Sequence, residues 1–213
     1  MLKRVVSSLL FSTLACGMLA AQNTGAKVAH TVPQGVVTPA QEPPALKTIF
    51  TDFGPTTTDY FNDTTGYYVL GPTNSVGDSE QWVGLPFTPK ANATVTQLQA
   101  AIGIISGTAV VDIGLYSDAS GTVGTLIAGG HSTKIPAFGA CCTVVSVNIP
   151  ATAVVAGTQY WIVATSDDTH GPDFTGVWQA SNVYPNVAAN EAAGSWFTFS
   201  ANIPAGAAKG TIP

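Results

Sequence analysis

The chain has 213 residues, of which 46% are hydrophobic and only 9% are charged. So low a charge content excludes a coiled coil, a charged helical bundle and a disordered chain kept open by its charge. The formal net charge is −5, with seven Lys and Arg residues in all. Such a chain has no basic patch to neutralise phosphates, so we expect no nucleic-acid partner.

The first 21 residues have the layout of a secretory signal peptide. A basic head precedes an apolar run from Val5 to Leu14, and small residues end the segment at Ala21. We expect cleavage after Ala21 and a secreted or cell-surface protein, because the apolar run is too short to cross a bilayer. Lipid attachment at Cys16 is the less favoured alternative, since Thr13 stands where a lipobox has Leu.

Three further segments follow the predicted signal peptide. Residues 22–46 are rich in Pro, Ala and Thr, which is typical of an extended linker. Residues 47–201 carry the pattern of a folded β domain, and for the small residues of 202–213 we predict a disordered tail. No segment of the predicted mature chain is long and apolar enough to cross a membrane.

Short segments with alternating apolar and polar residues predict an all-β fold. They are rich in β-branched and aromatic residues and cover 94–102, 110–116, 126–135, 142–149, 159–165 and 195–200. Turn signals containing Gly separate them at 106–107, 118–121, 136–139, 156–157 and 170–172. Many short strands joined by short turns predict an antiparallel two-sheet β-sandwich of jelly-roll type.

Five segments, in this order along the chain, occur together in a known family: 61–63, 86–89, 111–118, 136–142 and 156–161. With them the chain resembles the bacterial secreted choice-of-anchor domain family, type R, over roughly residues 50–200. The resemblance implies an exported β-sandwich, in a family whose members often end in a PEP-CTERM or similar surface-sorting tail. It implies no catalytic residue. No such tail follows the domain here, so the mode of surface retention stays open.

Cys141 and Cys142 are the two thiols of the predicted mature chain. In an oxidising compartment we expect them to be oxidised, and a bond between them is favoured because the mature chain offers no other partner. Two alternatives stay open: bonds to a second chain, and two small hydrophobic side chains on opposite faces of a strand. A redox enzyme would need a Cys-x-x-Cys motif, which the sequence lacks.

Asp167, Asp168 and Asp173 are grouped in a stretch that also holds a Gly turn. Carboxylates in a loop are suitable ligands for Ca²⁺, so these three residues are a candidate calcium site. The spacing does not match an EF-hand loop. The alternative is an ordinary solvated loop, because Asp favours turns. We predict no other cofactor.

Sequence motifs give no support for catalysis. There is no Gly-x-Ser-x-Gly nucleophile motif, and a glycosidase would need two facing carboxylates that no local motif indicates. His131 and His170 are each expected to be surface or capping residues, since neither has a motif partner. Asp112 projects from its strand opposite the apolar face, which alone does not make it catalytic. We predict that the protein is not an enzyme.

The aromatic residues are the best indication of binding. Most of them are expected to fill the core, whereas Trp178, with Gln179 and Asn182, is the candidate for an exposed ligand-binding face. We predict a secreted, non-enzymatic module with a structural or adhesion role at the cell surface or in the matrix. The alternative is a glycan-binding, lectin-like module that Ca²⁺ could assist. Its partner would be an extracellular polysaccharide or a surface protein; the oligomeric state is not indicated.

Overall fold

A computed structural model provides the structure of the protein. It describes residues 45–54, 60, 66–140, 144–167, 169–192 and 195–213, with 182–192 and 199–201 described by their backbone alone. The chain divides into Met1–Pro43 and Pro44–Pro213, and all described residues belong to the second unit. The predicted signal peptide and almost all of the predicted linker therefore lie outside the described residues.

The described residues form two antiparallel sheets and no helix, so none of them forms a helix that could span a membrane. The smaller sheet has the order β1 (Lys47–Thr51), β12 (Gly206–Thr211), β4 (Ala93–Ala100), β8 (Val145–Val154). The larger has the order β11 (Ser195–Pro204), β10 (Thr175–Ala192), β2 (Gly66–Leu70), β3 (Gln81–Phe87), β9 (Tyr160–Thr165), β6 (Val111–Asp118), β7 (Val123–Ser132), and β5 (Ile102–Ser106) pairs with β10.

The two sheets share one hydrophobic core. Alternate residues of β6, such as Ile113 and Leu115, are fully buried and belong to the same cluster as Leu98 of β4 and Val147 of β8. The period of two therefore places one face of each sheet in the core, as alternation predicts. The predicted all-β, antiparallel two-sheet sandwich is confirmed, while its assignment to the jelly-roll type stays a prediction.

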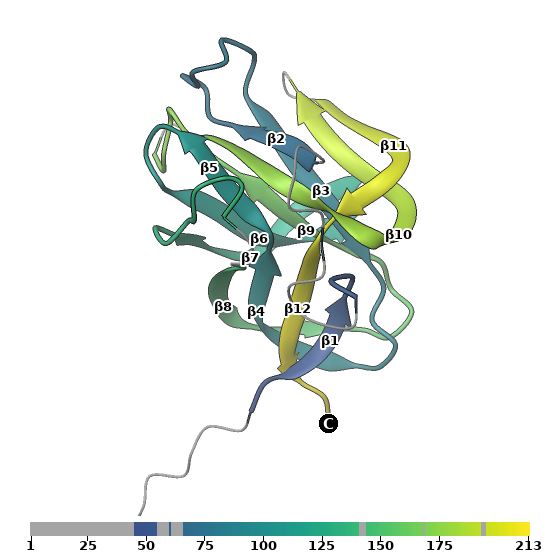
Figure 1. The fold of residues 1–213 in the computed structure, drawn as a ribbon. Helices are drawn as coiled ribbons and strands as arrows, with labels where there is room; N and C mark the ends of the chain where they lie inside the picture. Colours follow the sequence, from purple (N-terminus) through teal and green to yellow (C-terminus); the bar gives the residue numbers. More distant parts are fainter. Residues whose placement is uncertain (1–44, 55–59, 61–65, 141–143, 168, 193–194) are drawn as a thin grey trace, which may run out of the picture. The chain divides into compact units, whose positions relative to one another are not determined.

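The C-terminal residues are ordered, contrary to the prediction of a disordered tail. Residues 206–211 form β12, which runs between β1 and β4 and is buried over most of its length (Figure 1). Small side chains are what allow this close fit: a Cβ on Gly210 would lie 1.9 Å from the carbonyl oxygen of Thr94. Small residues are typical of a mobile terminus, but in β12 they allow tight packing between neighbouring strands.

Backbone hydrogen bonds join the two connections by which the chain passes from one sheet to the other, β4 to β5 and β11 to β12. The amide of Ala101, between β4 and β5, donates to the carbonyl of Ala205, between β11 and β12, at 3.0 Å. Gln179 of β10 completes this junction, because its amide donates to the Ala101 carbonyl and its carbonyl accepts from the Ala205 amide. The side chain of Asp52, just after β1, accepts from the Gly206 amide at 2.6 Å. We call these five residues the crossover junction.

Candidate functional site

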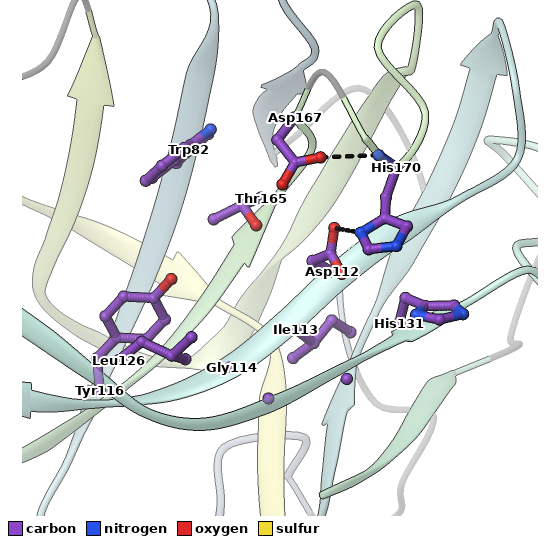
Figure 2. Close-up of a pocket in the computed structure, with 12 residues that line it drawn as sticks. Trp82, Asp112, Ile113, Gly114, Tyr116, Leu126, His131, Thr165, Asp167 and His170 are labelled. Atoms are coloured by element: carbon purple, nitrogen blue, oxygen red, sulfur yellow. Dashed lines mark hydrogen bonds and ion pairs between the residues drawn. The ribbon is translucent and has the colours of Figure 1, made fainter.

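A pocket of about 390 Å³ opens on the outer face of the eight-stranded sheet, opposite the core. Its lining residues come from β3, β6, β7, β9 and the loop that joins β9 to β10. Figure 2 shows two halves: Trp82, Tyr116 and Leu126 on one side, and on the other a polar group made of Asp112, His131 and His170. Thr165 and Asp167 also line it.

Strand register places Asp112 at the centre of the polar group. Asp112 on β6 lies directly opposite His131 on β7 and Thr165 on β9. Directly opposed residues in an antiparallel pair project from the same face with their Cβ atoms about 4.5–5.5 Å apart. Three residues that are 19 to 53 positions apart in the sequence therefore share one patch of the outer face.

The loop after β9 brings His170 onto this patch. Oδ1 of Asp167 accepts hydrogen bonds from the amides of Thr169 and His170, each at 2.7 Å, and Ser166 Oγ donates to the His170 carbonyl at 3.1 Å. The loop so fixed places Nδ1 of His170 3.2 Å from Oδ2 of Asp112 (Figure 2). The rings of His170 and His131 stack with their centroids 4.8 Å apart.

The electrostatics of the polar group centre on Asp112. Burial raises the pKa of its carboxyl, and the charge of Asp167 adds to this effect, while the imidazoles of His170 and His131 oppose it. Oδ2 of Asp112 is itself buried, and no donor in the described part of the chain is aligned with it as a hydrogen-bond partner. Burial, followed by the charges of Asp112 and Asp167, also raises the pKa of Tyr116.

The floor of the pocket is bare backbone. Gly114 of β6 and Gly129 of β7 are directly opposed on the outer face, beside the Asp112–His131 pair. A Cβ on Gly129 would meet its neighbours at 3.4–3.5 Å, whereas one on Gly114 would lie 2.6 Å from Leu126 and 2.7 Å from Tyr116. The missing side chains make room for a ligand to approach the sheet.

The aromatic half is held in place by contacts outside the pocket. Nε1 of Trp82 donates to Oε1 of Glu80 at 2.9 Å, and the ring lies against Trp196 with centroids 6.5 Å apart. Trp82, Tyr116 and Trp196 cover a small cluster made by Trp161 and its buried neighbours on the outer face. One edge of the pocket is thus a partly exposed aromatic surface that neighbouring side chains hold in position.

The predicted ligand face at Trp178 and Gln179 is wrong. Trp178 is fully buried, on the core side of β10, where it lies opposite Tyr67 of β2 and Ile102 of β5. Its Nε1 donates to the Ala205 carbonyl at 2.7 Å, so its polar atom is satisfied inside the molecule. Gln179 is only 3% exposed and belongs to the crossover junction. Neither side chain can contact an external ligand.

The predicted calcium ligands that the structure describes have separate local roles. Asp167 caps the turn before His170, and Oδ1 of Asp173 accepts from the amide of Thr108 at 3.0 Å. Within the described residues these two aspartates do not join a cluster of three metal-ligating side chains. Asp168, the third predicted ligand, lies outside the described residues, and calcium binding stays a prediction.

Three more residues predicted from the sequence have side chains outside the described part of the structure. Cys141 and Cys142 lie outside the described residues, so the disulfide stays a prediction. Asn182 is placed in β10 by its backbone, and its side chain is not described.

The members of the polar group stand in separate segments of the sequence, so the sequence does not indicate that they form one group. Asp112 was expected on the outer face of its strand, and His131 and His170 were each expected at the surface. What joins them is the register of β6 with β7 and the path of one loop. The only signal in the sequence was that Asp112 and His131 each occur in an alternating strand, which does not say that the strands are neighbours.

Comparison of the chain with family models, with curated proteins and with solved structures gives no match. The resemblance to the choice-of-anchor family consequently stays an expectation from the sequence segments that carry it.

Proposed function

We propose that this protein is an exported, non-enzymatic β-sandwich module that adheres to an extracellular glycan through the pocket on its eight-stranded sheet. The signal-peptide layout of the first 21 residues supports export. The observation that carries the binding role is the pairing of an aromatic surface with clustered polar side chains in one open pocket.

Sugar rings need two kinds of contact, and the pocket offers both. The apolar face of a sugar packs on an aromatic ring, for which Trp82 and Tyr116 are available. Its hydroxyl groups need hydrogen-bonding partners, which Asp112, Asp167 and Thr165 can supply. A volume of about 390 Å³ lies within the range of small-ligand sites, roughly 300–1,000 Å³.

The pocket also favours a binding role over a purely structural one. A module that only fills space in a matrix needs a closed polar surface, without a hollow floored by two glycines. An adhesion role remains part of the proposal, since the pocket would supply the adhesive contact. The surface partner is then a polysaccharide.

The test compares two aromatic variants in a screen against polysaccharides. Thermal unfolding and mobility in glycan-containing gels would be followed for the wild type, Trp82→Ala and Phe197→Ala, with and without EDTA. Phe197 is a suitable control because it is 59% exposed and does not line the pocket. We expect a glycan that raises the unfolding midpoint of the wild type and of Phe197→Ala, but not of Trp82→Ala.

Two results would contradict the proposal. Equal binding by the wild type and Trp82→Ala would place the glycan elsewhere, and no response to any glycan would remove the binding role. Because Trp82→Ala could itself disturb the fold, its far-UV and near-UV circular dichroism must match the wild type. Release of new reducing ends from a bound glycan would contradict the non-enzymatic part.

A further inference from the structure

The three ionisable side chains of the polar group converge on one small volume. Asp112, His131 and His170 each offer one ligand atom, and these atoms all lie within 4.8 Å of one another. They come from β6, from β7 and from the loop after β9, so long-range structure assembles the cluster. Asp112 and His170 are partly buried, and His131 is exposed at the rim.

An ordinary ion pair accounts for only part of this cluster. The 3.2 Å contact of His170 with Asp112 explains why these two side chains are neighbours. It does not explain His131, whose ring stacks on His170 and has no hydrogen bond within the described part of the chain. Nor does it supply an aligned donor for the buried Oδ2 of Asp112. Ring nitrogens of two imidazoles and an oxygen of one carboxylate are thus close together.

We propose that Asp112, His131 and His170 bind one divalent transition-metal ion of the class preferred by imidazole, such as Zn²⁺ or Cu²⁺. Two imidazoles with one carboxylate are a known donor set for such ions, whereas Ca²⁺ takes six to eight oxygen ligands. This site is separate from the calcium site predicted at Asp167, Asp168 and Asp173.

Small rotations of the side chains would complete the site. Ligand atoms around a tetrahedral Zn²⁺, at about 2.0–2.1 Å from the metal, are roughly 3.4 Å apart. His131 is the exposed member of the three, so its side chain has room to turn toward the Asp112–His170 pair. The hydrogen bonds of Asp167 and Ser166 fix the backbone at His170, which would hold that ligand in place.

Three protein ligands leave one coordination position of a tetrahedral metal open. The site faces a pocket, so an oxygen atom of an external ligand has room to occupy that position. The metal proposal does not depend on glycan binding, since the three ligands are sufficient for an ion without a sugar.

The test measures metal binding by the purified protein in the absence of any saccharide. Isothermal titration with Zn²⁺ would compare the wild type with Asp112→Asn, His131→Ala and His170→Ala. Two matched controls come from the rest of the chain: His30→Ala, which removes the third histidine, and the double substitution Cys141→Ser/Cys142→Ser. Electron paramagnetic resonance of the Cu²⁺ form would count its nitrogen ligands.

We expect one ion per chain, a loss of affinity of more than about tenfold in each of the three site variants, and unchanged affinity in both controls. The Cu²⁺ spectrum should report two imidazole nitrogens in the wild type and one in either histidine variant. Wild-type protein that binds no Zn²⁺ or Cu²⁺, or binding that the controls remove and the site variants keep, would overturn the proposal.

Failure of this proposal and failure of the glycan proposal are distinguishable. Trp82→Ala should lose the glycan and keep the metal, because Trp82 is in the aromatic half and supplies no ligand. A glycan that binds equally well in EDTA would leave the proposed function standing without the metal.

Discussion

Asp52 and Asp112 are both aspartates with buried carboxylate oxygens, but their surroundings differ. Asp52 lies in the crossover junction, fully buried, where burial raises its pKa to about 7 despite a hydrogen bond from the Gly206 amide. Asp112 lies in the pocket, where partial burial raises its pKa and the imidazoles of His170 and His131 act against this rise. Oδ2 of each aspartate is buried, and that of Asp112 lies 3.2 Å from Nδ1 of His170.

The difference separates a structural acid from a candidate ligand. Asp52 is surrounded by backbone that ties β1, β10 and β12 together, and its Oδ1 satisfies an amide that would otherwise be buried without an acceptor. Asp112 instead lies beside the ionisable side chain of His170 and lines a pocket that a ligand can enter. Substitutions in the crossover junction should therefore change stability, and those in the pocket should change binding.

The largest expected effect is a pH dependence of stability that comes from Asp52. Its pKa is about 7 in the folded state and 3.8 in the reference state, so between these pH values the folded protein holds one more proton than the unfolded chain. Stability should therefore fall as pH rises from about 4 through about 7, by up to roughly 4 kcal/mol. Urea unfolding at pH 5 and pH 8 should record about 3 kcal/mol of this fall, since the rest of it lies below pH 5.

The matched variant is Asp52→Asn, which cannot ionise and keeps an oxygen for the Gly206 amide. It should flatten the pH dependence and be more stable than the wild type at pH 8. An unchanged slope in Asp52→Asn would show that other groups cause the dependence.

The second effect concerns the close packing of β12. Gly210→Ala should destabilise the protein by about 2–3 kcal/mol, since its Cβ would meet the Thr94 carbonyl and force β12 away from β4. The free energy of unfolding from urea titration is the measurement. A loss below about 1 kcal/mol would mean that β12 can shift away from β4 at little cost.

A smaller effect is expected at the acid of the pocket. Asp112→Asn should change the free energy of unfolding by less than about 1 kcal/mol, because partial burial already disfavours the charge and the amide has nearly the same shape. Chemical denaturation at pH 7 would measure this alongside the metal titration. Destabilisation comparable to that of Gly210→Ala would place Asp112 among the structural acids and remove the contrast with Asp52.

The smallest effect on stability is expected at the floor of the pocket. Gly129→Ala places a Cβ at 3.4–3.5 Å from its neighbours, so we expect a change of about 0.5 kcal/mol or less. The methyl group projects into the pocket and should weaken glycan binding. Calorimetry with the glycan identified by screening measures the affinity, and urea unfolding of the same variant measures the stability. An unchanged affinity would show that the glycan does not bind next to Gly129.

The local elements of this fold follow closely from the sequence. All five predicted turns contain a glycine with positive φ in the structure, at Gly107, Gly121, Gly139, Gly157 and Gly171. The segment 110–116 became β6, and its alternation correctly assigned Ile113 to the core and Asp112 to the outer face. These features could be predicted because a turn's backbone angle and a strand's period of two are properties of a few adjacent residues.

The errors concern residues whose environment is set by distant parts of the chain. Trp178 was expected to be exposed, but pairing of β10 with β2 and β5 turns it into the core. The small residues of 206–211 were expected to be disordered, but they fill the narrow space between β1 and β4. Composition describes a segment alone and carries no information about the strands that will cover it.

The sequence by itself therefore determined the β class, six of the strands (β4, β6, β7, β8, β9 and β11) and the five glycine turns, because short-range sterics and hydrophobic periodicity are encoded residue by residue. Tertiary structure alone decided that Asp112 faces His131, that one loop brings His170 to both, and that the C-terminal strand completes the smaller sheet. Strand order and register arise from packing between residues far apart in the chain, and a one-residue shift would turn Asp112 to the opposite face.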